Sequence, residues 1–274
     1  MLKRIISGAV GISLIIAVLC LSSRVPIVVD IFISLVCAMA VGEFIHAIGY
    51  IKILQISVPS IAFAFVFPML FTYSTDKIIW YVYTAIMLSV LIFFHKKISF
   101  KEFAYTYSMA FIITVALSEI IAMKDMDVSH SALYFVITLA LPWLADAGAY
   151  FVGSFIGKHK LCPEISPKKT IEGAVGGVIV CVAATCGVGY LFSQFIYTGT
   201  ISVNYINLII ISLIGSLLSI LGDLSFSLIK RSCHIKDYGN LIPGHGGVLD
   251  RFDSVIFVAP FLSIIINYLP ILYK

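Results

Sequence analysis

A stretch of polar residues near the end of the chain has the composition of an ion-binding site. It runs from Ser227 to Asp253, and Asp223 lies just before it, inside an apolar segment. Lysines, arginines, aspartates and glycines gather here in a chain of which only 12% is charged. Because charged groups are costly beside a bilayer, a cluster of them next to apolar segments indicates a function.

The first part of this stretch places acid and base on one helix face. Asp223 and Ser227 are four residues apart, and Lys230 and Arg231 follow three and four residues after Ser227. In a helix this spacing brings all four side chains to the same side at the helix end. Lysine and arginine beside a carboxylate suit phosphate groups that a metal ion bridges.

The second part adds a glycine-rich loop and two further acids. Gly246 and Gly247 follow His245, so backbone N–H groups can approach an anion closely. Asp250 and Asp253 share one face at the start of the last apolar segment. Carboxylate oxygens, without thiols or paired histidines, suit a hard cation such as Mg²⁺. The whole pattern predicts a site for a metal-chelated nucleotide triphosphate at the membrane surface.

A second polar loop precedes a glycine-rich helix and is the expected partner of the first. The free N–H groups at that helix start favour a bound anion. The alternative is a solvated basic loop with an N-cap residue. The anion-binding candidates are Ser166, Lys168, Lys169 and Thr170.

Other polar residues lie within the apolar segments. Asp146 is a functional candidate because it is an acid within a span. Glu43 and His46 are three residues apart, a spacing that allows a pair within one helix. Gly173 and Gly177 form a small-xxx-small pair, which predicts close helix packing.

The composition indicates that most of the chain lies in a lipid bilayer. The 274 residues are 61% hydrophobic and the mean hydropathy is +1.08, whereas soluble domains are about 45–50% apolar. We expect an all-α polytopic integral membrane protein with about nine transmembrane helices. The first apolar run resembles a signal peptide, but no small-residue cleavage site follows, so an uncleaved span is favoured. The expected spans are 5–22, 26–48, 56–73, 78–94, 104–123, 133–156, 173–195, 205–229 and 252–270.

The basic residues predict the orientation of these spans. With a cytoplasmic N-terminus, 14 of the 18 Lys and Arg residues fall on the cytoplasmic side, and Lys274 is among the others. The two polar loops, 157–172 and 230–251, are then both cytoplasmic, where nucleotides are found. We expect residues 1–130 to form an N-terminal helix bundle and residues 131–274 to form the catalytic region.

At this point the motif resembles that of a known family. Residues 227–253 match the signature of the phosphatidate cytidylyltransferases, also called CDP-diglyceride synthases: Ser-x-apolar-Lys-Arg, Lys-Asp-x-small, and apolar-Pro-x-His-Gly-Gly-apolar-x-Asp-Arg-x-Asp. The resemblance covers about residues 140–255, including Ser166 to Gly173. The chain departs from many bacterial members at Phe226, where they have Glu, and at Ile171, where they have Trp.

The resemblance implies a reaction and a set of partners. CTP and phosphatidic acid would give CDP-diacylglycerol and pyrophosphate, with Mg²⁺, alone or with a second cation, as the cofactor. Membrane lipids and a second copy of the chain in a homodimer are the other implied partners, and no nucleic acid is expected. The expected location is the inner (plasma) membrane of the cell, with the active site on the cytoplasmic side.

The roles that we assign on this basis fall into three groups. The catalytic candidates are Asp223, Lys230, Arg231, Lys236, His245, Asp250 and Arg251. The metal candidates are Asp223, Asp250 and Asp253. The substrate-binding candidates are Asp146, Ser166, Lys168, Lys169, Thr170, Ser227, Gly246 and Gly247.

Two alternatives stay open at the level of sequence. A transporter or channel would also have many spans and intramembrane acids, although its acids should be dispersed near mid-membrane with some repeat symmetry. A cytidylyltransferase that acts on another lipid phosphate, such as an isoprenoid phosphate, would share the same polar residues.

Overall fold

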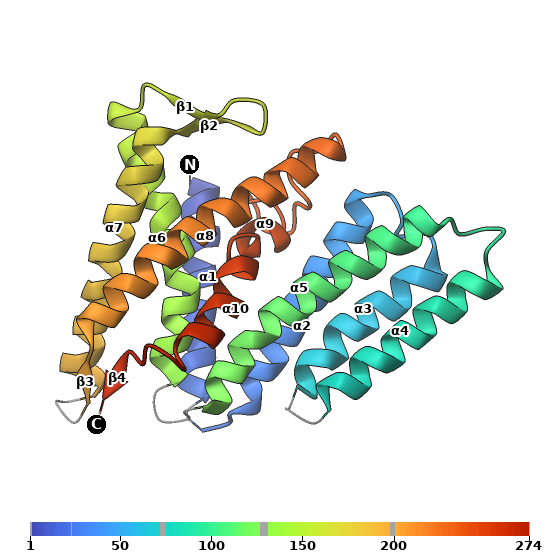
Figure 1. The fold of residues 1–274 in the computed structure, drawn as a ribbon, viewed down its shortest axis with the longest axis horizontal. Helices are drawn as coiled ribbons and strands as arrows, with labels where there is room; N and C mark the ends of the chain where they lie inside the picture. Colours follow the sequence, from blue (N-terminus) through green and yellow to red (C-terminus); the bar gives the residue numbers. More distant parts are fainter. Residues whose placement is uncertain (1, 23, 72–74, 127–130, 198–200, 274) are drawn as a thin grey trace. The chain divides into compact units, whose positions relative to one another are not determined.

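The protein is a helical assembly with two short pairs of β-strands, of which β1–β2 is a hairpin (Figure 1). The computed structural model describes residues 2–22, 24–71, 75–126, 131–197 and 201–273, so Lys274 of the charge count lies outside the described residues. The helices are α1 (Leu2–Ser22), α2 (Ile27–Ala47), α3 (Leu54–Met69), α4 (Asp76–Phe93), α5 (Phe100–Met126), α6 (Ser131–Ile156), α7 (Ile171–Leu191), the π-helical turn η1 (Phe192–Ile196), α8 (Tyr205–Ser232), α9 (Leu249–Phe252) and α10 (Val255–Ile265). The strands are β1 (Lys160–Cys162) with β2 (Ser166–Thr170), and β3 (Ser202–Val203) with β4 (Leu272–Tyr273), both pairs antiparallel.

All nine expected apolar segments contain a helix, but fewer are long enough to cross a bilayer. Within the described ranges, six helices have the length and apolar composition of a span: Ile27–Ala47, Asp76–Phe93, Phe100–Lys124, Ala132–Ile156, Ile171–Ile196 and Tyr205–Ser232. The shorter apolar helices are Ile6–Ser22, Leu54–Met69 and Val255–Ile265. A helix as short as α10, with 11 residues, reaches only about 16 Å, against a hydrocarbon core of about 30 Å. The polytopic all-α fold is thus confirmed and the count of nine spans is not.

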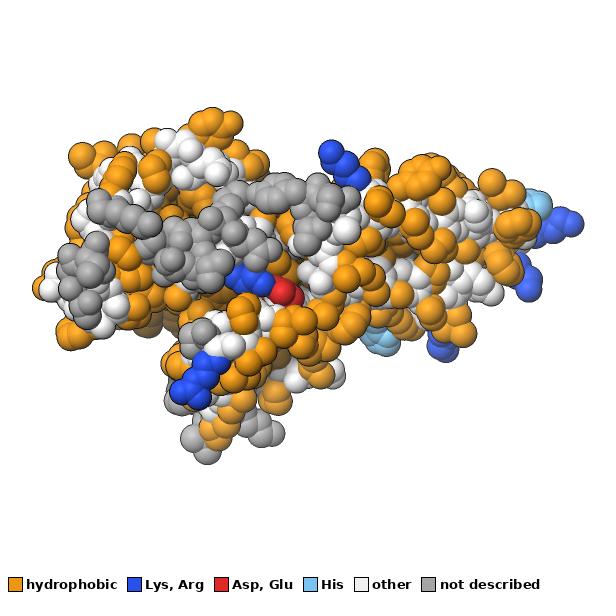
Figure 2. Space-filling view, turned by 90° about the horizontal axis from the view of Figure 1, so that it is seen from below, with side chains coloured by type: hydrophobic (Ala, Val, Ile, Leu, Met, Phe, Trp, Pro, Cys, Tyr) orange, Lys and Arg blue, Asp and Glu red, His pale blue; other side chains and the backbone are white. Residues whose placement is uncertain are grey.

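Apolar side chains cover much of the protein surface, as expected for a membrane protein. Figure 2 shows a face on which hydrophobic side chains predominate and charged side chains are few. Phe93, Phe155 and Tyr268 are among the most exposed large side chains. Such exposure is costly in water and favourable in lipid, so the chain is an integral membrane protein.

The chain divides into two compact units, and the polar stretch is divided between them. The first unit consists of Met1–Ala122 and Cys233–Phe252, and the second of Met123–Ser232 and Asp253–Lys274. The predicted division into an N-terminal bundle (1–130) and a catalytic region (131–274) concerns function, so it stays a prediction. Its boundary adjoins residues 127–130, which lie outside the described residues.

The first unit is built on neighbouring helices at its N-terminal end. Helix α1 packs beside α2, α2 beside α3, and α3 beside α4. The rings of Phe63 and Tyr83 stack with centroids 4.1 Å apart between α3 and α4. The short helix α9 lies against α2, so the loop that precedes α9 belongs with the N-terminal helices.

The second unit packs α6, α7, α8 and α10 together, and glycines allow the closest approaches. A Cβ on Gly173 would lie 2.7 Å from the carbonyl oxygen of Ala149 on α6. A Cβ on Gly177 would lie 2.7 Å from the carbonyl oxygen of Ala145. The packing role predicted for Gly173 and Gly177 is therefore confirmed.

This packing makes a prediction with a matched control on the same helix. Gly177→Ala forces a methyl group against the α6 backbone, and overpacking of this kind costs about 1–3 kcal/mol. In Gly187→Ala the new methyl meets nothing within 4 Å, and alanine favours a helix over glycine by about 1 kcal/mol. Thermal unfolding in detergent is expected to show a lower Tm for Gly177→Ala and an equal or higher Tm for Gly187→Ala. Equal stability of the two variants would contradict the close packing.

Candidate functional site

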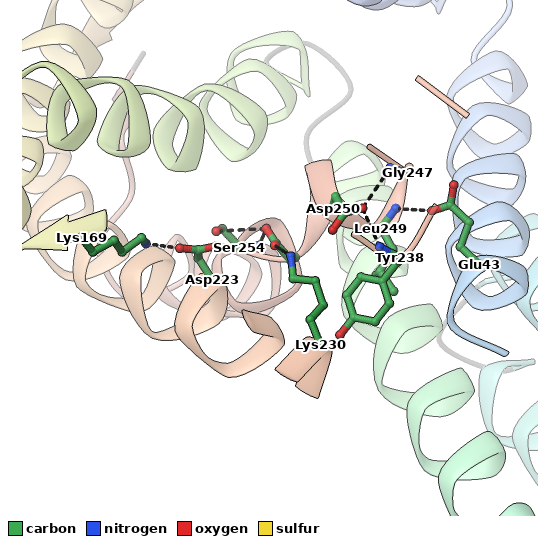
Figure 3. Close-up of polar contacts among 10 residues, drawn as sticks. Glu43, Lys169, Asp223, Lys230, Tyr238, Gly247, Leu249, Asp250 and Ser254 are labelled. Carbon is green, nitrogen blue, oxygen red and sulfur yellow. Dashed lines mark hydrogen bonds and ion pairs between the residues drawn. The ribbon is translucent and has the colours of Figure 1, made fainter. Parts of the chain in front are cut away.

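Two lysine–aspartate pairs form the polar centre of the second unit. Lys169 of β2 makes an ion pair with Asp223 of α8. The Nζ of Lys230, also on α8, lies 3.5 Å from Oδ2 of Asp253, just before α10 (Figure 3). The sequence predicts the loop around Lys169 as the partner of the polar stretch, and the Lys169–Asp223 pair confirms this.

Local structure explains how the β1–β2 hairpin holds Lys169 at this place. Thr170 caps α7 by accepting a hydrogen bond from the Gly173 N–H at 3.1 Å. Glu172, in the first turn of α7, accepts hydrogen bonds from the backbone N–H groups of Lys158 and His159, which lie just before β1. The residues before β1 and the last residue of β2 are thereby both hydrogen-bonded to the first turn of α7. Thr170 is 7% exposed, so the structure gives its hydroxyl a capping task.

Gly222 brings the start of α10 close to α8. A Cβ on Gly222 would lie 3.1 Å from the Cα of Ser254 and 3.2 Å from the carbonyl oxygen of Asp253. Asp223 follows Gly222 directly in the sequence. The close approach therefore places Asp223 and Asp253 near one another.

The Lys230–Asp253 pair is buried, which sets its electrostatics. Lys230 is 8% exposed and Asp253 is 6% exposed. Burial, followed by the negative charge of Asp223, raises the pKa of the Asp253 carboxyl to about 7, while the Lys230 ammonium acts against this rise. The Ser254 N–H donates to Oδ1 of Asp253 at 2.8 Å. The Lys230 ammonium therefore favours the ionised form of this carboxyl, against the effects of burial and of Asp223.

In the first unit, Asp250 organises the loop of residues 238–248, which we call the glycine–histidine loop. Oδ2 of Asp250 accepts hydrogen bonds from the N–H groups of Tyr238 and Gly247, both at 2.9 Å (Figure 3). Gly244 and Gly246 have φ values of +80° and +86°, a region that residues with a Cβ rarely adopt. The Gly247 N–H, predicted as a donor to substrate, is therefore engaged with Asp250.

Glu43 of α2 is a member of this group that sequence reasoning missed. Its Oε1 accepts from the Val248 N–H at 3.0 Å, and its Oε2 accepts from the Leu249 N–H at 2.8 Å. The expected pairing with His46 is replaced by these contacts, because both carboxylate oxygens turn toward the loop. Glu43 and Leu249 are 206 residues apart, and no periodic signal in the sequence connects them.

His245 also has a partner on an N-terminal helix. Its Nδ1 lies 2.7 Å from the hydroxyl of Ser7 on α1. That hydroxyl donates to the carbonyl oxygen of Pro243 at 3.0 Å. These contacts hold the His245 ring against the first helix of the chain.

The remaining predicted residues are more accessible. The Nε of Arg231 donates to the carbonyl oxygen of Ile165 at 3.4 Å. The exposed residues among the candidates are Lys168, Arg231, Lys236 and Arg251, and the partly buried ones are Asp146, Ser166, Ser227 and Gly246.

The donor set of the second unit fits a hard divalent cation. Asp223 is close enough to Asp253 for its negative charge to act on the Asp253 carboxyl. Within the described parts of the chain, no three His, Cys, Asp or Glu side chains converge as a complete metal cage. Mg²⁺ is commonly held by one or two carboxylates together with substrate phosphates and water, and two aspartates suit that mode.

Comparison with known proteins gives a consistent result. The model of the cytidylyltransferase family matches residues 2–269. A phosphatidate cytidylyltransferase of Bacillus subtilis (strain 168) is 37% identical over 177 residues, which are 65% of this chain and 63% of that protein. A phosphatidate cytidylyltransferase of Staphylococcus haemolyticus (strain JCSC1435) is 38% identical over 181 residues, or 66% of this chain and 65% of that protein. The chain thus spans slightly less than two thirds of the length of these relatives.

Proposed function

Because the chain belongs to the cytidylyltransferase family, we propose that it transfers the cytidylyl group of CTP to phosphatidic acid. The products are CDP-diacylglycerol and pyrophosphate. The observation that carries this proposal is the pair of lysine–aspartate contacts in the second unit, Lys169–Asp223 and Lys230–Asp253. They combine oxygen ligands for a cation with ammonium groups for phosphate, in a protein whose surface suits a lipid substrate.

The chemistry needs little from the protein beyond positioning and charge. A phosphate oxygen of the lipid, already anionic at neutral pH, attacks the α-phosphorus of CTP. A new P–O bond forms as the bond between the α-phosphorus and the bridging oxygen breaks, and pyrophosphate leaves with that electron pair. We assign Lys169 and Lys230 to phosphate oxygens, because fixed ammonium groups offset repulsion between anions and stabilise the leaving charge.

Asp223 and Asp253 are our candidates to hold Mg²⁺. When bound, the cation supplies Lewis-acid stabilisation of the phosphate oxygens. The two carboxylates would hold the cation, and Lys169 and Lys230 would contact phosphate oxygens beside it. The sequence also predicts Asp250 as a ligand, but its Oδ2 accepts two backbone hydrogen bonds, and we propose that it positions the glycine–histidine loop.

The exposed cations are assigned to the phosphates of CTP or of the lipid. Arg231, Lys236 and Arg251 are all accessible to such groups, and arginine binds phosphate in a bidentate manner. His245 stays a proposed hydrogen-bonding contact of these phosphates on the family pattern. Asp146, Ser166, Lys168 and Ser227 stay proposed substrate contacts on the family pattern.

The proposed location is the plasma membrane, with the reaction on its cytoplasmic face. The support is the distribution of Lys and Arg, which places the polar loops on that side. The homodimer that the family resemblance implies stays a prediction.

An assay of the purified protein tests the function directly. We expect detergent-solubilised protein with labelled CTP, phosphatidic acid and Mg²⁺ to form a CDP-lipid and pyrophosphate in equal amounts. Omission of phosphatidic acid, or chelation of Mg²⁺, is expected to remove both products. Thin-layer separation of the lipid and an enzymatic pyrophosphate assay provide the two measurements.

The alternatives give different outcomes in the same experiment. Product with an isoprenoid phosphate but none with phosphatidic acid would reassign the acceptor. Absence of product with any lipid phosphate, together with solute flux into vesicles without CTP consumption, would replace the enzyme by a transporter.

A further inference from the structure

We propose that Glu43 of α2 is a positioning residue that holds the glycine–histidine loop in its binding conformation. The identity of the ligand that the loop binds rests on the proposed function. The contacts that hold the loop do not depend on it. It assigns to an N-terminal helix a task in the polar site that the signature motif does not include.

The hydrogen bonds identify the task. The two oxygens of one carboxylate accept from the consecutive N–H groups of Val248 and Leu249, at 3.0 and 2.8 Å. Hydrogen bonds to an ionised acceptor are among the stronger ones in proteins. Because Leu249 begins α9, the carboxylate fixes the point at which the loop ends and the helix with Asp250 and Arg251 begins.

The packing around the carboxylate is equally specific. A Cβ on Gly239 would lie 2.6 Å from Oε1 of Glu43, and one on Gly247 would lie 2.3 Å from Oε2. Neither glycine has the positive φ that requires glycine. The space taken by Glu43 therefore accounts for glycine at these two positions, at the two ends of the loop.

Glu43 and Asp250 accept hydrogen bonds from different backbone N–H groups of the loop and of the start of α9. Asp250 accepts from Tyr238 and Gly247, and Glu43 accepts from the next two residues, Val248 and Leu249. The amides of residues 247–249 thus bind protein carboxylates. These three amides are therefore occupied by the protein itself, and the rest of the loop depends on both carboxylates for its place.

Hydrogen exchange of the ligand-free protein tests the positioning without any assay of function. In Glu43→Gln the amide NH₂ faces one of the two backbone N–H groups, so at least one hydrogen bond is lost. We expect peptides that cover residues 244–250 to exchange at least about 10-fold faster, since loss of a charged acceptor weakens local protection. Peptides of α7 and α8 are expected to be unchanged. Glu119→Gln, another partly buried glutamate on a helix of the same unit, is the matched control and should leave the loop unchanged.

A double-variant cycle connects Glu43 to its glycine neighbour. Gly239→Ala is expected to accelerate exchange of the same peptides, because its methyl displaces the carboxylate. In a Glu43→Ala background the methyl meets no carboxylate, so Gly239→Ala should add less than about 2-fold. Additive effects of the two changes would overturn the proposed contact, as would normal loop exchange in Glu43→Gln.

Turnover then connects the position of the loop to the reaction. Glu43→Gln is expected to lower CDP-lipid formation about 10- to 100-fold, the usual effect of losing a residue that orients a functional group, and Glu119→Gln to change it less than about 3-fold. Faster loop exchange with full turnover would overturn the link to the site. If the unmodified protein has no such turnover, the proposed function fails while the exchange data still decide the positioning.

Discussion

Asparagine at position 223 is expected to lower CDP-lipid formation by at least about 100-fold, while the protein remains folded in detergent. Asp223 lies on α8 in an ion pair with Lys169, and its charge acts on Asp253. Asparagine keeps the shape of the side chain but removes the charge that would hold a cation. Initial rates with labelled CTP over a series of Mg²⁺ concentrations measure the effect, and we expect the variant to require more Mg²⁺ for its residual rate.

Asp30→Asn is the matched control for this experiment. Asp30 is a partly buried aspartate in the first turn of α2, and it is not among the candidate site residues. Its neutralisation is expected to change the rate less than about 3-fold. Near-normal turnover of Asp223→Asn at every Mg²⁺ concentration would remove Asp223 from the cation site. An equal loss in Asp30→Asn would show that the effect is not specific to position 223.

The sequence alone predicts those features that depend on local pattern. Apolar runs identify the helices, because lipid excludes unpaired backbone groups and rewards apolar side chains over a long segment. The spacing of Gly173 and Gly177 identifies a packing face, and the motif of residues 227–253 identifies the family. Each of these signals is contained within one contiguous segment.

The features that were missed depend on contacts between distant segments. By spacing, Glu43 is a possible partner of His46 within one helix, and only the fold shows its carboxylate at the start of α9. Ser7 reads as a small residue of the first helix, yet it contacts His245. Backbone N–H groups have no letter in the sequence, so an acid that binds them cannot be distinguished from one that binds a side chain.

The roles of the aspartates show the same limit. Asp250 and Asp253 share a helix face by spacing, and the sequence predicts a metal-binding role for both. In the structure Asp250 accepts from two loop amides, whereas Asp253 is paired with Lys230. Loss of activity in an Asp250→Asn variant would therefore report on the loop as much as on a cation, and the residues of the second unit test the cation more cleanly.

Neutralising Lys230 and Asp253, first singly and then together, is expected to distinguish the contribution of the pair to stability from its contribution to the reaction. Both side chains are buried, so Lys230→Met or Asp253→Asn alone leaves one charge without its partner. Breaking a buried pair in this way costs about 3–5 kcal/mol, whereas replacing both members is often close to neutral. We expect each single variant to unfold at a lower temperature in detergent, and the double variant to regain most of the stability.

Activity is expected to follow a different course from stability in the same three variants. If Lys230 binds phosphate and Asp253 holds the cation, the double variant stays at least about 100-fold below the unmodified protein, because charges that act on the reacting groups are gone. Lys101→Met, which removes an exposed lysine 5.7 Å from the ring of Tyr105, should change neither property appreciably. Recovery of both stability and turnover in the double variant would assign the pair to the fold alone. A double variant that is stable but inactive would instead show that the reaction needs the two charges, because the protein without them is still folded.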